Sequence, residues 1–255
     1  MRIVFVGAGN LATRLSLEMH RAGMIVEQVY SHTTEHAKSL AEKLNCPWTT
    51  NLTEIKSDAD LYVFSLKDAV LQEVIAGVKS NNGLWVHTAG SMSMSVFEGY
   101  ANRFGVLYPL QTFSREREIG FKTVPFFVEA NSEKDKNVLQ EIASALSEDV
   151  RYLSSEKRKY LHLAAVFACN FTNHIYTLAG KIVAEQEIPM NVLYPLIDET
   201  AAKIHEMPPR DAQTGPAIRY DENVINKHLA MLNDQDMKTI YQLMSQSIHK
   251  EAQNE

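Results

Sequence analysis

The chain has 255 residues, of which 45% are hydrophobic and 22% are charged, with 11 glycines and 8 prolines. These proportions are those of an ordinary globular protein, so they exclude disordered, collagen-like and coiled-coil classes, and the length suits two domains of modest size. The net charge is −6 and neither half of the chain is basic, which argues against nucleic acid as a partner.

Apolar runs and cysteines indicate where such a chain resides. The longest uninterrupted apolar run, residues 163–169, falls well short of the roughly 18 residues that a membrane-spanning helix needs. Residues 1–6 contain no cleavage site of a signal peptide. Cys46 and Cys169 lie far apart, so neither a disulfide nor a cysteine metal site is expected. We therefore predict a reduced, cytoplasmic protein with no membrane partner and no metal.

Strands and helices alternate along the first 150 residues. Short β-branched apolar runs predict strands, and apolar residues at helical spacing predict amphipathic helices. The predicted strands lie at residues 2–6, 25–29, 60–65, 83–87, 105–108 and 124–128, and the helices at residues 11–22, 34–44 and 69–78. This alternation predicts an α/β fold with a mainly parallel, doubly wound sheet.

After about residue 150 the pattern is helical only. Apolar spacing predicts helices at residues 155–185, 189–205, 222–232 and 235–250, and turn residues predict a loop at 207–217. The charged residues 155–159 are expected to form a solvated helix start. We therefore predict a nucleotide-binding domain at residues 1–150 and an all-helical domain at residues 151–255.

The strongest chemical signal is a Gly-x-Gly-x-x-Ala sequence between the first strand and the first helix. Gly7 permits a tight turn, Gly9 leaves room for a pyrophosphate, and Ala12 lets the helix pack closely on the sheet. The alternative is a structural turn that binds nothing. The predicted cofactor-binding residues belong to this loop and to the ends of two neighbouring strands: Gly7, Ala8, Gly9, Asn10, Leu11, Ala12, Ser31, His32, Thr33, Ser65 and Leu66.

The end of the second strand bears on the choice between NAD and NADP. NAD-binding domains usually carry an Asp or Glu there, which holds the ribose 2′-hydroxyl. This chain has Ser31, His32 and Thr33 instead, and Glu27 falls inside the strand. The hydroxyl groups can donate hydrogen bonds to a 2′-phosphate, and a protonated His32 adds positive charge. We favour NADP, the alternative being a merely polar loop that caps the next helix.

His162 and Asn170 stand out in the helical half, at the two ends of an apolar stretch. A buried asparagine costs free energy unless its amide is hydrogen-bonded. In a regular helix the two residues are roughly 80° apart around the axis, so both can line one cleft between the domains. We interpret His162 as transferring a proton or orienting substrate, and Asn170 as bonding substrate. The alternative is that both satisfy nearby backbone groups, as we expect for His174.

Five segments of the sequence resemble a known family: residues 7–12, 87–91, 108–113, 162–171 and 214–221. Over essentially its whole length the chain resembles proteins that join an NADP-binding Rossmann domain to a C-terminal DUF2520 domain. That group is similar to pyrroline-5-carboxylate reductase and to the deazaflavin-dependent NADP oxidoreductases. The resemblance implies a Rossmann sheet, a helical second domain and NADP as the cofactor, and it says little about the substrate.

Three positions depart from the patterns of these relatives. His32 stands where the family commonly has an arginine for the 2′-phosphate, and Tyr220 replaces a glycine in the last segment. The wider β-hydroxyacid dehydrogenase group places a catalytic lysine four residues before an asparagine, where this chain has Val166. The proton must therefore come from His162, from another side chain or from water.

Two functions remain open. The first is an oxidoreductase that moves a hydride between NADP and a small C=O or C=N substrate in the interdomain cleft. The second is a non-catalytic NADP-binding module whose helical domain serves dimerisation or partner binding. Small residues that let helices approach closely occur along the long helical segment, at Ala164, Ala165, Ala168 and Ala179. We therefore predict a homodimer formed mainly by the helical domain.

Overall fold

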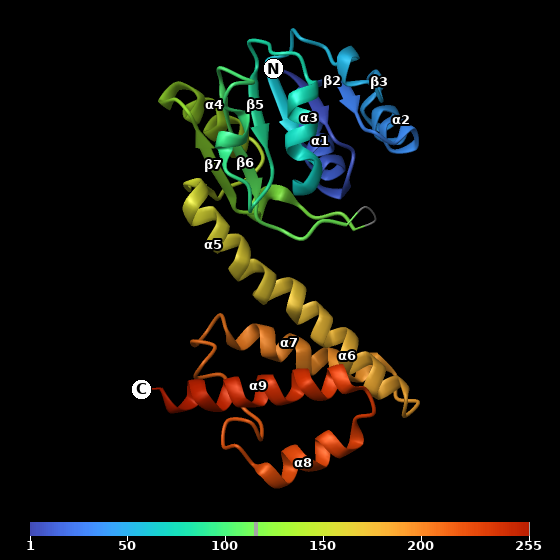
Figure 1. The fold of residues 1–255 in the computed structure, drawn as a ribbon, viewed down its shortest axis with the longest axis vertical. Helices are drawn as coiled ribbons and strands as arrows, with labels where there is room; N and C mark the ends of the chain where they lie inside the picture. Colours follow the sequence, from blue (N-terminus) through green and yellow to red (C-terminus); the bar gives the residue numbers. More distant parts are fainter. Residues whose placement is uncertain (115–116, 255) are drawn as a thin grey trace. The chain divides into compact units, whose positions relative to one another are not determined.

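The structure is a computed structural model that describes residues 1–114 and 117–254. The described chain divides into two compact units, Met1–Cys169 and Asn170–Glu255 (Figure 1). Strands end at Tyr152 and the helices that follow begin at Ser155, whereas the compact units divide between Cys169 and Asn170, so the domain boundary at residue 150 stays a prediction. The first helix after the strands thus belongs to the same compact unit as the sheet.

One sheet of eight strands forms the centre of the first unit within the described ranges. The strands are β1 (Arg2–Val6), β2 (Ile25–Tyr30), β3 (Trp48–Thr49), β4 (Leu61–Phe64), β5 (Leu84–His87), β6 (Phe104–Pro109), β7 (Phe126–Ala130) and β8 (Val150–Tyr152). Their order is β3-β2-β1-β4-β5-β6-β7-β8, and the first six are parallel, as in a Rossmann sheet. Strand β7 runs antiparallel to β6, and β8 runs parallel to β7. The predicted fold class is confirmed.

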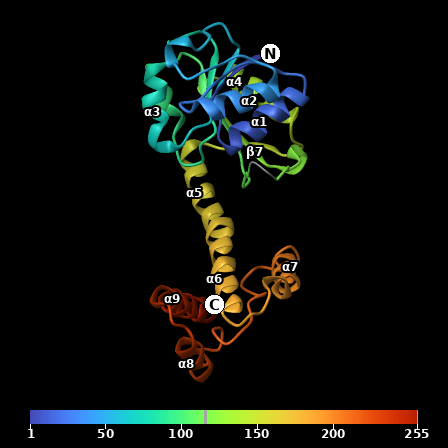
Figure 2. The same ribbon diagram turned by 90° about the vertical axis from the view of Figure 1, so that its right-hand side faces the viewer.

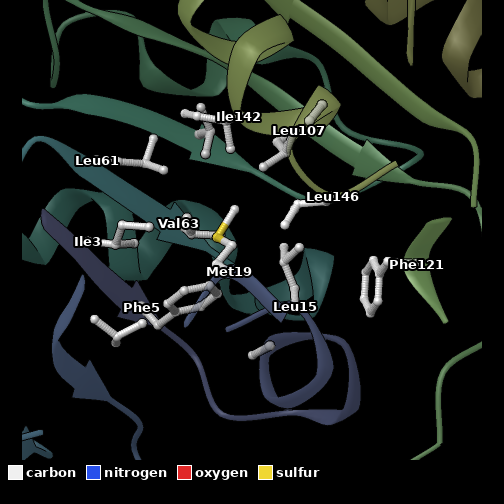
Figure 3. Close-up of a cluster of buried hydrophobic side chains, with 14 of the residues drawn as sticks. Ile3, Phe5, Leu15, Met19, Leu61, Val63, Leu107, Phe121, Ile142 and Leu146 are labelled. Carbon is white, nitrogen blue, oxygen red and sulfur yellow. The ribbon is translucent and has the colours of Figure 1, made fainter. Parts of the chain in front are cut away.

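Helices cover both faces of the sheet, which is why β4 and all but the first residue of β1 are apolar. Those of the first unit are α1 (Asn10–Arg21), α2 (Thr34–Leu44), α3 (Asp68–Gly77), α4 (Glu133–Ser144) and α5 (Ser155–Ala165). Alternate residues of β1 point to opposite faces. Ile3 and Phe5 pack with residues of α1, α2 and α4, whereas Val4 and Val6 pack with residues of α3 (Figure 2; Figure 3).

The helix predicted at residues 155–185 is not regular throughout. It comprises α5, a π-helical segment at Val166–Phe171 and α6 (Thr172–Ala184). A π-helical turn holds more residues than an α-helical turn, so the angle of about 80° between His162 and Asn170, which assumed a regular helix, does not apply. Single π-helical turns are frequent at functional sites, and this one contains Asn170.

The second unit is helical in all its described elements, which confirms that part of the prediction. It contains α6, a short helix at Met190–Leu193, α7 (Tyr194–Lys203), α8 (Glu222–Met231) and α9 (Gln235–Gln253). Among the described residues of this unit, only Ala217, Ile225 and Ser245 are buried in the single chain. No helix in the described ranges has the length and apolar character needed to cross a membrane.

Candidate active site

The glycine loop after β1 lies against the end of β4. Gly7 has φ +122°, a conformation that favours glycine, and a Cβ at this position would collide with the backbone carbonyl of Ser65. The Gly7 amide donates a hydrogen bond to the Tyr30 carbonyl at 2.8 Å. Ala12 is completely buried in the core beneath the sheet. The loop therefore forms the tight turn that the sequence predicts, between the ends of β2 and β4.

Gly9 has different surroundings, and they suit a bound phosphate group. Its φ of −77° and ψ of −173° are open to any residue, and a Cβ built on it would meet no described atom within 4 Å. Residues Asn10–Ala12 include no acid, and Gly9, the N-cap residue of α1, has no side chain with which to cap the helix. The amide groups and the helix dipole at this end are thus suited to an anion.

The residues at the end of β2 form a compact hydrogen-bonded turn. Ser31 is buried, and its Oγ accepts a hydrogen bond from the Thr33 amide at 3.3 Å. His32 is exposed, and its Nε2 lies 3.1 Å from the hydroxyl oxygen of Thr33. The side chain best placed to meet a ligand from solvent is therefore that of His32.

His32 and His36 have H-x-x-x-H spacing, but His32 precedes α2 and only His36 lies on the helix. His36 lines a small cavity of about 80 Å³ beside the glycine loop, together with Glu35 and Lys43. Within the described ranges, however, no group of three or more His, Cys, Asp or Glu residues could hold a metal ion.

The larger cavity, of about 330 Å³, lies at the carboxyl ends of β5 and β6 and at the first residues of α1 and α3. In open α/β sheets, ligands bind in the crevice beyond the carboxyl ends of the strands. The polar residues that line the cavity are Asn10, Asp68, Thr88, Ser91, Tyr108, Gln111 and His162. Ser91 donates a hydrogen bond to Asp68, and Thr88 donates one to Ser65 at 3.2 Å. The cavity therefore adjoins the predicted cofactor residues.

Tyr108 and His162 form a hydrogen-bonded pair in this cavity. The Tyr108 hydroxyl lies 3.2 Å from His162 Nδ1, and the two rings meet edge to face. Gly90 makes room for the imidazole, because a Cβ on Gly90 would lie only 2.5 Å from His162 Nδ1. Burial raises the pKa of Tyr108, an effect that the positive charge of Arg158 opposes. Tyr108 therefore keeps its proton at neutral pH, as a proton donor must.

A buried histidine shapes the loop that carries Gly90. His87 is fully buried, its Nδ1 accepts a hydrogen bond from the Ala89 amide at 3.1 Å, and its Nε2 lies 3.3 Å from the Ser93 carbonyl. This pattern requires the neutral ring with the proton on Nε2. Burial, assisted by the charge of Arg158 and opposed by the Ser93 carbonyl, lowers the pKa of His87 to about 3.

The neutral state of His87 predicts a stability that falls in acid. Between the ordinary pKa of 6.5 and about 3, the unfolded chain binds a proton at His87 that the folded chain does not bind. The stabilisation of the folded chain by neutral His87 is therefore complete above pH 6.5. As the pH falls below 6.5, the free energy of unfolding decreases by about 1.4 kcal/mol per pH unit. Urea unfolding at a series of pH values from 7 to 4 should show this decrease in the free energy of unfolding for the parent. The decrease per pH unit should be smaller for His87→Gln. Equal slopes would contradict the prediction.

The structure corrects one expectation about the charged residues 155–159. Lys157 and Lys159 are exposed as expected, but Arg158 is completely buried and pairs with Glu129 at 2.7 Å. The expectation of a wholly solvated helix start was therefore wrong. The error arose because one basic residue in a charged run points to the interior, where its partner comes from β7, 29 residues earlier.

The predicted site residues divide into two sets. The structure brings together the glycine loop, the ends of β2 and β4, and His162 within the first unit. Asn170 begins the second unit, and it is exposed in the single chain rather than buried as the sequence suggested. Its role, and the predicted interdomain cleft, stay predictions.

A backbone feature explains one departure from the related sequences. Tyr220, which replaces a glycine, has φ +50°, in the left-handed region that favours glycine. Its ring packs against that of His249, with 4.9 Å between the centroids.

Comparison with known proteins identifies the family. Residues 2–87 match the family described as NADP oxidoreductase, coenzyme F420-dependent, and residues 124–248 match the domain of unknown function DUF2520. A candidate NADP oxidoreductase from Bacteroides fragilis is 52% identical, with 98% of each chain covered and a TM-score of 0.92. The chain belongs to this family of DUF2520-containing NADP oxidoreductases. The resemblance read from the sequence is confirmed, and so are the predictions of an NADP-dependent oxidoreductase and of NADP as its cofactor.

More distant structures share the fold of this DUF2520-containing oxidoreductase. A protein from Thermotoga maritima is 22% identical, with 99% of this chain and 100% of that chain covered and a TM-score of 0.79. A 1-pyrroline-5-carboxylate reductase from Streptococcus pyogenes is 12% identical, with 99% of this chain and 98% of that chain covered and a TM-score of 0.64. The comparison with curated proteins found no match.

Reasoning from sequence missed Tyr108, Gly90 and the Glu129–Arg158 pair. Tyr108 and Gly90 lie in two of the segments that resemble the family, residues 87–91 and 108–113, so the signal was present but no role could be read from it. The ion pair gave no such signal, because nothing in the sequence distinguishes Arg158 from the lysines on either side.

Proposed function

We propose that this oxidoreductase reduces a small C=O or C=N substrate with NADPH in the cavity at the carboxyl ends of β5 and β6. The observation that carries the proposal is the hydrogen-bonded Tyr108–His162 pair, which opens into the same cavity as Asn10, the first residue of the phosphate-binding helix. A proton-donating pair beside a nucleotide site is what reduction requires, because a proton must accompany the hydride.

The residues of the first unit fit NADP. The α1 amide groups and the open space at Gly9 would hold the pyrophosphate, and His32 with Thr33 would face the 2′-phosphate. Ser65 and Leu66 lie against the glycine loop, as the close approach of the Ser65 carbonyl and the Leu66 side chain to Gly7 indicates. When bound, NADPH supplies the hydride.

The chain's own residues supply the proton. In the proposed step the Tyr108 hydroxyl gives its proton to the carbonyl oxygen or imine nitrogen of the substrate, and the protonated His162 ring replaces it from Nδ1. The 3.2 Å separation of the hydroxyl and Nδ1 suits this transfer. Solvent then returns a proton to the imidazole.

A turnover screen tests the proposal. The purified chain is mixed with NADPH and a panel of ketones, imines and 2-oxoacids, and consumption of NADPH is followed by absorbance. We expect consumption with at least one carbonyl or imine class, and its loss in Tyr108→Phe. If NADPH binds but no compound is reduced, the non-catalytic module becomes the better explanation.

We expect tighter binding of NADPH than of NADH, since no acid stands at residues 30–33. The exposed His32 gives the cleanest test, because Ser31 is buried and a charge placed there would disturb the fold. His32→Arg should raise the preference for NADPH by about tenfold, and His32→Glu should shift it toward NADH by a similar factor. Fluorescence titration with both nucleotides measures the preference. Equal preference in the parent and both variants would remove the 2′-phosphate argument.

We also propose a homodimer formed by the second unit. This unit buries few residues in the single chain, yet large apolar side chains are exposed on its helices, among them Leu196 at 63%, Met231 at 75% and Leu243 at 60%. An exposed apolar surface of this kind marks an interface. Ala179 in this unit, and Ala164, Ala165 and Ala168 in the helical residues just before it, support close helix packing with a second copy, whose two-fold symmetry would use the same surface twice.

Light scattering should give twice the chain mass of 28.8 kDa at micromolar concentration. Leu243→Glu should weaken the dimer about 100-fold or more, because two-fold symmetry places the buried charge in the interface twice. The matched control is Ile25→Glu, at an exposed apolar residue of the first unit, which should leave the dimer intact. A monomeric parent would contradict the proposal.

A further inference from the structure

Arg158 is a charged side chain in an unusual place. It lies on α5 with no exposed surface, and its partner Glu129 on β7 is only 5% exposed. Its Nη1 donates to a Glu129 carboxylate oxygen at 2.7 Å, while its Nε has no hydrogen-bond partner among the described residues. A buried ion pair is weak evidence for stability, since apolar residues of similar size often serve as well. Its position therefore needs another explanation.

The pair ties together three segments around the cavity. Arg158 Nη2 donates to the Met92 carbonyl at 2.5 Å, in the loop after β5. Ser155, at the start of α5, donates to Glu129 through its amide at 2.8 Å and its hydroxyl at 2.6 Å. The Met94 amide donates to the Ser155 hydroxyl at 3.0 Å. The loop after β5, strand β7 and the first turn of α5 thus share one buried network.

These segments adjoin both members of the proton-donating pair, since His162 lies further along α5 and Tyr108 lies on β6. His162 follows Arg158 by four residues on α5, so both lie on one side of the helix. The loop fixed by Arg158 includes Gly90, on which the His162 ring rests. Strand β7 pairs with β6, and Tyr108 lies opposite Phe127, two residues before Glu129. Both members of the pair therefore depend on the network for their positions.

Arg158 also acts on Tyr108 through its charge. The guanidinium opposes the effect of burial on Tyr108 and favours the phenolate that forms when the hydroxyl gives up its proton. Because Glu129 is paired with the guanidinium, it partly neutralises this charge.

We propose that Arg158 and Glu129 are positioning residues for proton donation, which hold the loop after β5 and the start of α5 so that His162 lies against Tyr108. The role in turnover rests on the function proposed above, whereas the effect on Tyr108 does not.

Turnover and NADPH binding are measured first in Arg158→Met, which keeps an unbranched, flexible side chain and removes the charge. Misplacement of a reacting group typically lowers the rate by about 10- to 100-fold, so kcat should fall by this factor while the dissociation constant of NADPH changes little. Arg158→Lys keeps the charge and should recover part of the loss. Lys159→Met, at an exposed neighbour on α5, is the matched control and should match the parent.

The second readout is the titration of Tyr108, followed by ultraviolet absorbance as the difference between each protein and the same protein carrying Tyr108→Phe. Loss of the Arg158 charge should raise the pKa of Tyr108, whereas general loosening would expose the ring and lower it. Glu129→Gln should lower the pKa, because the arginine charge is then less neutralised. If Arg158→Met does not fold, turnover in Arg158→Lys and the Tyr108 pKa in Glu129→Gln test the inference instead.

The outcomes separate the two proposals. A parent that reduces no substrate, with the two opposite shifts of the Tyr108 pKa observed, would overturn the proposed function and leave the electrostatic role of the network standing. Unchanged turnover in Arg158→Met, or a Tyr108 pKa that falls in that variant, would overturn the inference.

Discussion

Replacing His162 with glutamine is expected to slow turnover by about 100- to 10,000-fold, the usual contribution of general acid–base catalysis. Glutamine keeps a similar size and can still bond the Tyr108 hydroxyl, which lies 3.2 Å from the imidazole. It cannot carry the proton that restores Tyr108. NADPH affinity should be nearly unchanged, because the phosphate-binding residues belong to the glycine loop and the end of β2.

The matched control for this substitution is His174→Gln, at an exposed histidine in α6. It should keep parental turnover, nucleotide affinity and melting temperature. Steady-state kinetics, fluorescence titration and thermal unfolding are measured on the same preparations. Full turnover in His162→Gln would end the catalytic interpretation of this residue.

Asn170→Leu tests the other residue that the sequence proposed. Leucine keeps roughly the volume of the side chain and removes both its hydrogen-bond donor and its acceptor. If Asn170 bonds substrate, the variant should lose mainly substrate affinity and turnover rate. A structural asparagine would instead leave activity per folded molecule unchanged and alter the melting temperature. NADPH affinity should stay close to that of the parent in either case.

Replacing Gly9 with valine is expected to weaken NADPH binding by about 100-fold or more, equivalent to about 2.7 kcal/mol. A side chain at Gly9 would enter the open space in which the pyrophosphate is proposed to lie, and it would meet no described protein atom within 4 Å. The backbone there is extended, so the fold should tolerate the change. Nucleotide titration and thermal unfolding together test this combination.

Gly7→Ala is the contrasting variant. With φ at +122° and the Ser65 carbonyl in the path of any Cβ, it should lower the melting temperature. Substitutions of the two glycines should thus have different effects. Replacing Gly7 should lower the stability of the fold, and replacing Gly9 should weaken the binding of NADPH. Normal NADPH affinity in Gly9→Val would contradict the assignment of the loop.

The sequence predicted the sheet well because both of its faces are buried. The continuous apolar runs of β1, β4 and β5 are typical of a sheet covered on both sides. Two strands and one α-helix of the described residues were among the elements that escaped prediction: β3 has two residues, β8 ends in two exposed residues, and α4 begins in a run of charged residues. Such elements owe their position to tertiary contacts more than to local pattern.

The candidate site was predictable where a residue's role depends on local geometry. Gly7 and Gly9 could be assigned because a turn between a strand and a helix imposes the same requirements wherever it occurs. Tyr108 could not, because its role arises from His162, which lies 54 residues later. Arg158 could not either, since its burial depends on Glu129 in β7. A regular helix was the wrong basis for relating His162 to Asn170, because of the π-helical segment between α5 and α6.

Direct observation of isotope transfer tests the central claim, that this chain passes hydride from NADPH to a small substrate in the cavity beside Tyr108 and His162. NADPH deuterated at the transferable position of the nicotinamide is incubated with the protein and the compounds found by the turnover screen. The mass of the product is then measured by mass spectrometry. We predict a product one mass unit heavier than that from unlabelled NADPH, formed by the parent and strongly reduced in His162→Gln and Tyr108→Phe. A product without deuterium, or equal transfer by all three proteins, would contradict the account.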